Sequence, residues 1–168
     1  MDHLVKATAE DVRVYAAVTT ELTGEAARRH GCGALASAAL GRTMTGALLF
    51  AATMKEQECI TMKFAGDGPL GAITADASAD GAVRGYVAHP EVELPLTNGK
   101  LSVGQGVGRG LLSVTRFTGL KEPFTGSCEI YSGEIAEDLT HYLFQSEQTP
   151  SSVGLGVLVE PDGRIGAA

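Results

Sequence analysis

One stretch of this 168-residue chain constrains the fold more than any other. Residues 31–54 carry a single charge, on Arg42, and are otherwise mostly Ala, Gly, Ser and Thr with a few larger apolar residues. A segment of that length could cross a bilayer. An arginine near its centre costs about 2.5 to 3.5 kcal/mol on insertion, however, and Ala and Gly offset little of that cost. The stretch therefore predicts a buried helix over residues 34–55 and no association with a membrane.

After this helix the spacing of apolar residues changes from helical to alternating. Ile60, Met62 and Phe64 alternate with Thr61 and Lys63, which is typical of a strand with one buried face. Turns rich in Gly, Asp and Pro separate further extended runs. The predicted elements are a hairpin from runs 4–8 and 12–18, a meander from the run at 60 with runs 70–77 and 83–87, a pair from runs 111–117 and 124–131 around a turn at 119–123, a strand at 153–159, and a strand beginning at 164.

A second, amphipathic helix is predicted over residues 133–145, because its apolar side chains recur every three or four residues. Its first half carries the carboxylates Glu134, Glu137 and Asp138, and a helix dipole favours negative charge at that end. A carboxylate site is the alternative explanation of this cluster. Since no repeated β-α-β alternation is present, we expect an α+β fold with layered, mostly antiparallel sheets. The sheets are expected to pack with the long Ala-rich helix, which lies on the sheet that holds Ile60, and with the amphipathic helix.

The pattern most similar to a ligand-binding loop is GQGVGRG at residues 104–110. A dinucleotide-binding loop requires G-x-G-x-x-G between a strand and a helix, but Arg109 occupies the place of the third glycine and a strand is predicted to follow. A Walker loop requires Gly-Lys followed by Ser or Thr, whereas Lys100 is followed by Leu101. We therefore predict a bulged or mobile loop. A small enzyme that binds an anion at this loop stays open as an alternative.

The three cysteines, Cys32, Cys59 and Cys128, are far apart and include no C-x-x-C pair. They indicate neither a disulfide scaffold nor a zinc site, and we expect buried or half-buried free thiols. Cys128 and His141 could form a nucleophilic dyad, but no third group that would orient them is indicated. A packed thiol and an ordinary helix histidine are therefore favoured. The sequence predicts no catalytic residue, no cofactor-binding residue and no metal ligand.

Charge and composition exclude several kinds of partner. The formal net charge is −7, and a grip on nucleic acid needs clustered Lys and Arg, so no nucleic-acid partner is expected. Aromatic residues make up 5% of the chain and Trp is missing, which argues against a stacking platform for sugars or bases. The N-terminal residues lack the basic and long apolar regions of a secretory signal. Together with the free thiols, this predicts a cytoplasmic protein.

Several long segments carry a resemblance to a known protein family. They are ASAALGRTMT at 36–45, GDGPLG at 66–71, FTG at 124–126, YLFQSEQTPSSVG at 142–154 and GVLV at 156–159. In order and spacing they are similar to the N-terminal domain of the redox-regulated thirty-three-kilodalton heat-shock proteins. The matches follow in order from Asp2 to Ala168, so the resemblance covers essentially the whole chain.

This resemblance implies an ATP-independent holdase chaperone domain, and no enzyme, that binds unfolding proteins and prevents their aggregation under oxidative and heat stress. It implies unfolded or partly folded client proteins and a homodimer as partners, while the residues that bind clients are unknown. In the family the redox switch is a C-terminal zinc domain, with cysteines in C-x-C and C-x-x-C pairs and a linker that unfolds on oxidation. Neither pair occurs here. Residues 1–168 are thus expected to be the N-terminal domain without linker and zinc domain, and no cofactor is expected in this chain.

Two other classes stay open beside the holdase, a small enzyme and an oligomeric binding module. An enzyme should show a pocket with convergent polar groups and perturbed pKa values. A holdase should show a broad apolar groove or a subunit interface instead. Sheet edges, such as the one expected near residues 164–168, also predict self-association.

Overall fold

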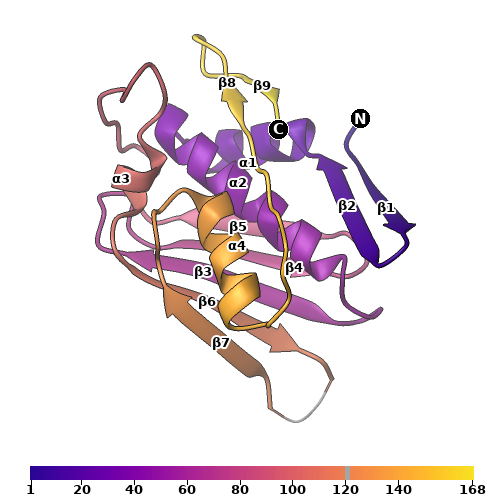
Figure 1. Cartoon of the computed structure of the whole chain (residues 1–168). Helices are drawn as coiled ribbons and strands as arrows, with labels where there is room; N and C mark the ends of the chain where they lie inside the picture. Colours follow the sequence, from indigo (N-terminus) through magenta and orange to yellow (C-terminus); the bar gives the residue numbers. More distant parts are fainter. Residues whose placement is uncertain (120–121) are drawn as a thin grey trace.

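The computed structural model describes residues 1–119 and 122–168 and has the predicted α+β architecture (Figure 1). In chain order its elements are β1 His3–Ala9, β2 Val12–Val18, α1 Thr20–His30, α2 Ala34–Ala51, β3 Cys59–Gly66, β4 Ile73–Ser78, β5 Val83–Val87, α3 Val103–Val107, β6 Gly110–Phe117, β7 Phe124–Glu129, α4 Ile135–Gln145, β8 Leu158–Val159 and β9 Ile165–Ala167. A five-stranded antiparallel sheet has the order β5-β4-β3-β6-β7, and two separate two-stranded sheets are β1-β2 and β8-β9. The predicted hairpin, meander and β6-β7 pair are confirmed.

Helix α2 lies at the centre of the domain, packed on the five-stranded sheet as predicted. Side chains alternate between the two faces of a strand. The three largest apolar side chains of β3, Ile60, Met62 and Phe64, therefore all belong to the buried core that α2 shares. The helix is long and apolar enough to cross a membrane, but 83% of it is buried inside the fold. This burial is what the core of a globular domain requires of it.

Small residues let a second layer approach the other side of α2. Gly41 lies under Thr23 of α1 and under Val157, so closely that a Cβ at this position would overlap Thr23. A Cβ on Gly46 would lie 3.2 Å from Leu139 and 3.3 Å from Leu155, tighter than ordinary van der Waals contact. Helix α2 is thus enclosed between the sheet and a layer formed by α1, α4 and the extended segment 153–157, which crosses α2 in Figure 1.

Two predicted strands are shorter in the structure. The run predicted at 70–77 forms a strand only from Ile73, because Leu70 is buried in the core and its N–H donates to the carbonyl oxygen of Gly106. The run predicted at 153–159 pairs with β9 only at Leu158–Val159. Its earlier residues pack their side chains on α2 instead and have no partner strand among the described residues. The predicted turn at 119–123 includes residues 120 and 121, which lie outside the described ones.

The helix predicted at 34–55 ends at Ala51, where the hydroxyl of Thr53 donates to the carbonyl oxygen of Phe50 at 2.7 Å. The helix predicted at 133–145 begins at Ile135, because Gly133 has a φ of 75°, in the left-handed region. Both predictions are otherwise confirmed. Helix ends are decided by such local polar contacts and backbone angles, which apolar periodicity does not report.

The prediction of a bulged or mobile loop at 104–110 is wrong, because its first residues belong to the short helix α3. Val103 and Val107 are fully buried and anchor this helix in the core. Glycines allow its backbone to lie directly on the neighbouring chain: a Cβ on Gly66 would overlap the carbonyl oxygen of Val107, and one on Gly68 that of Gly106. The glycines thus serve close backbone packing and not mobility.

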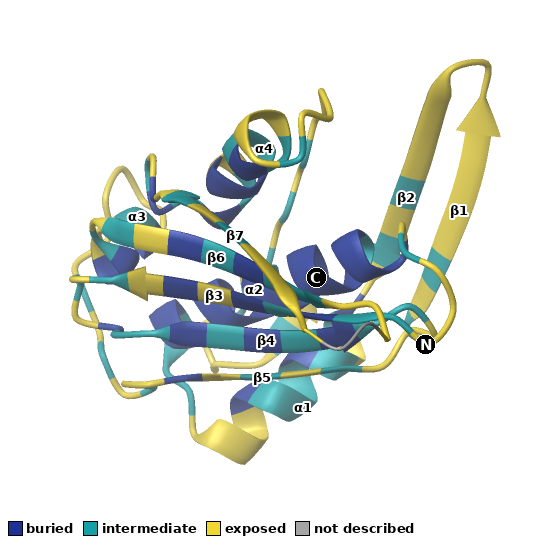
Figure 2. Ribbon diagram, turned by 90° about the horizontal axis from the view of Figure 1, so that it is seen from below, coloured by how far each residue is buried: buried dark blue, intermediate teal, exposed yellow. Residues whose placement is uncertain are grey.

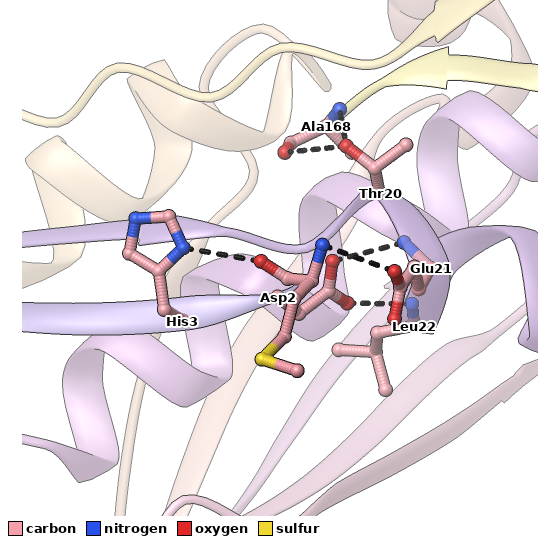
Figure 3. Close-up of polar contacts among 7 residues, drawn as sticks. Asp2, His3, Thr20, Glu21, Leu22 and Ala168 are labelled. Carbon is pink, nitrogen blue, oxygen red and sulfur yellow. Dashed lines mark hydrogen bonds and ion pairs between the residues drawn. The ribbon is translucent and has the colours of Figure 1, made fainter.

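The β1-β2 hairpin projects from the rest of the domain (Figure 2) and is attached at its base. The carboxylate of Asp2 accepts hydrogen bonds from the N–H groups of Glu21 at 3.0 Å and Leu22 at 2.7 Å (Figure 3). It therefore caps the N-terminus of α1 from a distant position in the chain. Next to it, the carbonyl oxygen of Ala168 accepts the N–H of Thr19 at 2.9 Å, which brings the last residue beside the hairpin.

Replacing Gly66 with alanine is expected to destabilise the domain by about 2 to 3 kcal/mol, because the new Cβ would push α3 away from β3. The matched control is Gly154→Ala, where nothing lies within 4 Å of the added Cβ. The control should change the free energy of unfolding by no more than about 0.5 kcal/mol. Urea unfolding followed by circular dichroism measures both, and equal stability of the two variants would contradict the close packing of α3.

Candidate functional site

The five-stranded sheet has one covered and one open face. Residues 60, 62 and 64 of β3 face α2, so Thr61 and Lys63 face the opposite side. The same alternation continues in β4, where Ile73, Ala75 and Ala77 are buried and their neighbours are half-buried. Within the described residues, the helices that contact the sheet belong to its covered side, as the arrangement in Figure 1 shows.

The open face combines small hydroxyl side chains with a few large apolar ones. Leu111 and Phe117 of β6 and Tyr86 of β5 are 51%, 42% and 50% exposed. Their partners in the strand register are outward-facing residues, since Leu111 pairs with Ala65 and Phe117 with Cys59. The small hydroxyl residues of this face are Thr61, Thr74, Ser78, Ser113, Thr115, Thr125 and Ser127. The same alternation places Lys63, Asp76, Arg84 and Glu129 on this face, which is therefore broad, partly apolar and carries two charges of each sign.

A shallow hollow of about 490 Å³ lies at one end of the open face. Its lining includes Cys59, Val83 and Phe117, and most of that lining is apolar. Asp76 lies in it too, but its carboxylate already accepts hydrogen bonds from Thr61 at 2.6 Å and from Arg84 at 3.0 Å. The hollow offers apolar contact and does not gather free polar groups for chemistry.

The N–H groups of the Gly-rich segment are already used by the chain's own carboxylates. Gly104 donates its N–H to Glu134 at 3.2 Å, and Arg109 donates its N–H to Asp67 at 2.7 Å. Glu134 also forms an ion pair of 3.3 Å with Arg42. A cradle for an external anion needs such donors to be free. The Gly-rich pattern at 104–110 does mark a place where backbone N–H groups bind carboxylates. Both carboxylates, of Glu134 and Asp67, belong to this chain and not to a ligand.

Asp138 has a more specific role than the helix dipole that sequence reasoning assigned to it. It is completely buried, and its Oδ1 accepts the backbone N–H groups of Tyr131 at 2.5 Å and Ser132 at 3.1 Å. Burial raises the pKa of this carboxyl, the hydrogen bonds from those N–H groups lower it, and the negative charge of Glu137 raises it further, so the net shift is upward. Glu137 and Asp138 do lie in the first turn of α4, as predicted. The apolar spacing of this helix gave no signal that one of its carboxylates would be buried.

The thiols are separated in space as well as in sequence. Cys32, Cys59 and Cys128 are free and half-buried, as predicted. Burial raises the pKa of Cys32 and of Cys128, for which the charge on Asp138 adds to the effect. In the part of the chain that the structure describes, no hydrogen bond joins Cys128 to His141. The His141 ring stacks on the Tyr131 ring instead, with 5.5 Å between the ring centres. Among those residues no three His, Cys, Asp or Glu side chains are grouped to hold a metal ion.

Comparison with known proteins decides the family. The family model described as Hsp33 protein matches residues 2–168. The chain belongs to the Hsp33 family. Proteins named 33 kDa chaperonin in Desulforamulus reducens and Bacillus subtilis are 54% and 55% identical over 99% and 100% of this chain, and over 58% and 59% of their own lengths. The crystal structure of the 33 kDa chaperonin (HSP33) of Thermotoga maritima matches with a TM-score of 0.91 at 42% identity, over 97% of this chain and 57% of that one.

The Hsp33 resemblance seen in the sequence is thereby confirmed, and so is the fold class. The chain spans just under three fifths of the length of the relatives it matches. The segment at 142–154 that most strongly marked the family also has a structural role. Tyr142 is fully buried and donates its hydroxyl hydrogen to Glu147 at 3.1 Å, and Glu147 forms an ion pair with Arg116 of β6. The Arg116 guanidinium lies 5.0 Å from the centre of the Phe50 ring, so this network joins α4, β6 and α2.

The buried carboxyl of Asp138 should make the stability of this Hsp33 domain depend on pH. A raised pKa in the folded state favours the protonated form there, so this contribution to stability is fully present below the unfolded pKa of about 3.9 and is lost as pH rises through the folded pKa. Asp138→Asn cannot ionise. The free energy of unfolding of this variant minus that of the natural protein is therefore expected to increase with pH above about 4.

Urea unfolding over a series of pH values measures this difference, with Asp162→Asn as the control. Arg164 lowers the pKa of the exposed Asp162, so its contribution is lost as pH falls and the control difference should change in the opposite direction. A pH-independent difference for Asp138→Asn would contradict the shift.

Proposed function

We propose that this Hsp33 domain is an ATP-independent holdase that binds unfolding proteins on the open face of its five-stranded sheet. The observation that carries the proposal is the exposure of Leu111, Phe117 and Tyr86 on a face whose other residues include many small hydroxyl side chains. A holdase must accept many sequences, so it needs exposed apolar area and little directional chemistry. The relatives' name, 33 kDa chaperonin, supports a chaperone.

The same geometry argues against the two rival classes. A small enzyme would need free donors at the Gly-rich segment, but Glu134 and Asp67 accept the N–H groups of Gly104 and Arg109. A Cys-His nucleophile would need a deprotonated thiol, whereas burial raises the pKa of Cys128. An oligomeric binding module would also explain the exposed apolar face, through a homodimer interface, so the relatives' name is what favours the chaperone over it.

We infer further that the redox switch of the family depends on residues other than the three thiols of this chain. Cys59 lies on the open face, while Cys128 packs at the edge of the core. Such scattered thiols cannot supply the tetrahedral ligand set of a zinc ion, so no zinc-dependent step is assigned to these residues. Free thiols also support a reducing location, and we propose that the protein acts in the cytoplasm.

Adding a charge to the open face should weaken aggregation suppression. Leu111→Lys and Phe117→Lys each place an ammonium group where an apolar client segment would lie, so the amount of domain needed for half-suppression should rise at least about threefold. Leu96→Lys is the control, because Leu96 is also exposed but lies outside the sheet. Light scattering of a heat-denatured model protein without ATP measures this. If all three variants match the natural protein, the open face is not the client surface.

Suppression should be the same with reductant and with peroxide, because the described thiols are separated and form no switch. The same assay with both additives tests this for the natural chain and for a variant with Ser at positions 32, 59 and 128. A large gain with peroxide that the triple variant loses would show that these thiols do regulate the domain. A gain that the triple variant keeps would point to oxidation elsewhere, for example of methionine.

A further inference from the structure

The tight turn at residues 97–100 contains the only asparagine of the 168-residue chain. Asn98 and Gly99 both have a positive φ, of 51° and 74°, which identifies a two-residue type I′ turn. The N–H groups of Thr97 and Lys100 donate to each other's carbonyl oxygens at 2.9 and 3.0 Å. This pair is an isolated bridge outside the named strands, and all four residues are exposed. The turn can therefore open without disturbing the sheet or the core.

Asn98 carries an electrophilic carbon next to a backbone nitrogen that is not engaged. Its residue is exposed, and the N–H of Gly99 has no acceptor among the described residues. Nothing lies within 4 Å of the place where a Cβ on Gly99 would be. Since glycine has no side chain, the Gly99 nitrogen can approach the side-chain carbonyl carbon of Asn98 without steric hindrance once the turn opens.

The other pairs of this kind differ from Asn98-Gly99 in the state of the glycine N–H. Gln105-Gly106 lies in α3, where Gly106 donates its N–H to the carbonyl oxygen of Ser102 at 3.0 Å. The chain also has three Asp-Gly pairs, and in each the glycine N–H donates to a carbonyl oxygen: Gly68 to Val107 at 3.0 Å, Gly81 to Ser78 at 3.0 Å and Gly163 to Glu160 at 2.8 Å. The reactive pair is thus also the one whose nucleophile is unbonded.

We propose that Asn98 is a site of self-modification, at which the backbone nitrogen of Gly99 converts the asparagine to aspartate and isoaspartate. A bond forms between the Gly99 nitrogen and Cγ of Asn98, the bond from Cγ to Nδ2 breaks, and the side-chain amide leaves as ammonia with the Gly99 N–H proton. Water then opens the five-membered imide. Its attack on Cγ gives aspartate, and its attack on the main-chain carbonyl carbon gives isoaspartate, whose main chain is one atom longer. Water is the only co-reactant, and the proposal does not depend on the chaperone function.

The fold should slow this reaction only slightly. Ring closure requires rotation about the Cα–C bond of Asn98, so the two hydrogen bonds between Thr97 and Lys100 must break first. Both are exposed to water, where each contributes little to stability, and the turn can open locally. The folded chain is therefore expected to react at no less than about one thirtieth of the rate of the unfolded chain. A site reached only by global unfolding would be protected at least about thousandfold.

The two products should differ in their effect on the turn. Aspartate keeps the length of the main chain and tolerates the left-handed region, so the turn persists with one more negative charge. Isoaspartate lengthens the main chain between Thr97 and Lys100, so their two hydrogen bonds cannot both form. The hydroxyl of Thr97 is also hydrogen-bonded to that of Ser102 at 2.8 Å, and Ser102 directly precedes α3. Isoaspartate should therefore loosen the segment between the turn and α3.

The experiment incubates the whole 168-residue chain, folded and unfolded in guanidinium chloride, at one temperature below its melting temperature. The tryptic peptide of residues 85–100 contains Asn98 and no glutamine, so a gain of one mass unit in it reports this site alone. Asn98→Gly is the control, because Gly-Gly also suits a type I′ turn but has no side-chain amide. We expect the gain in the natural chain and none in the control. Protection of the folded chain beyond about thirtyfold, or a gain that the control retains, would overturn the proposal.

Limited proteolysis tests the effect of isoaspartate, which chromatography of the same peptide quantifies. Trypsin should cut the incubated, folded natural chain after Lys100 at least about threefold faster than the fresh chain. Asn98→Asp keeps the main-chain length and should be cut within about twofold of the fresh rate, while incubated Asn98→Gly controls for damage elsewhere. Circular dichroism and melting temperature establish that each sample is folded. Equal cleavage of the fresh chain and a chain rich in isoaspartate would overturn the unpairing of the turn.

Discussion

The close packing of small residues on both sides of α2 is the constraint on which the rest of the domain depends. A helix enclosed between a sheet and a second layer must let two neighbours approach its axis, and only small side chains permit this. Gly41 and Gly46 admit Val157 and Leu155 on the outer side, while Ala38 and Ala39 are among the buried residues of the core. The only charged side chain of this helix, Arg42, forms an ion pair with Glu134, the residue before α4. The apolar composition of α2, which resembles that of a membrane span, is therefore required by its position between two layers of the core.

A second level of order comes from carboxylates that bind backbone N–H groups far away in the chain. Asp2 caps α1, Asp138 accepts the N–H groups before α4, and Asp67 and Glu134 hold the two ends of the Gly-rich segment around α3. Each of these donors would otherwise be left without a partner at a helix end or a tight turn, at a cost of about 1 to 3 kcal/mol where it is buried. The acidic residues of the chain therefore contribute to structure as well as to solubility, because some of their carboxylates accept hydrogen bonds from backbone N–H groups.

The spacing of apolar residues in the sequence was sufficient to predict the elements that bury one face against a single neighbouring element. The alternation at Ile60, Met62 and Phe64 predicted both the strand and its packing on α2, and the turn residues after it predicted the meander. It failed where a distant partner decides the conformation. Residues 153–157 are strand formers that pack on Gly41 and Gly46 with no neighbouring strand among the described residues, and residues 103–107 become helical with Val103 and Val107 buried in the core. The open face had a similar limit, since alternation placed Thr61 outward but could not show whether a helix of the described residues would cover it.

Stability and the proposed client contact rest on different residues of this domain, and the separation has a physical reason. The core is complete without the open face, because the inward residues of all five strands are already covered by α2, α3 and α4 or by neighbouring strands. Leu111 and Phe117 on the sheet can therefore stay in solvent without being needed for folding. Exposed apolar area usually invites self-aggregation. Here the net charge of −7 makes copies of the chain repel each other, whereas the proposed client, a neutral extended segment of another protein, would meet no such barrier.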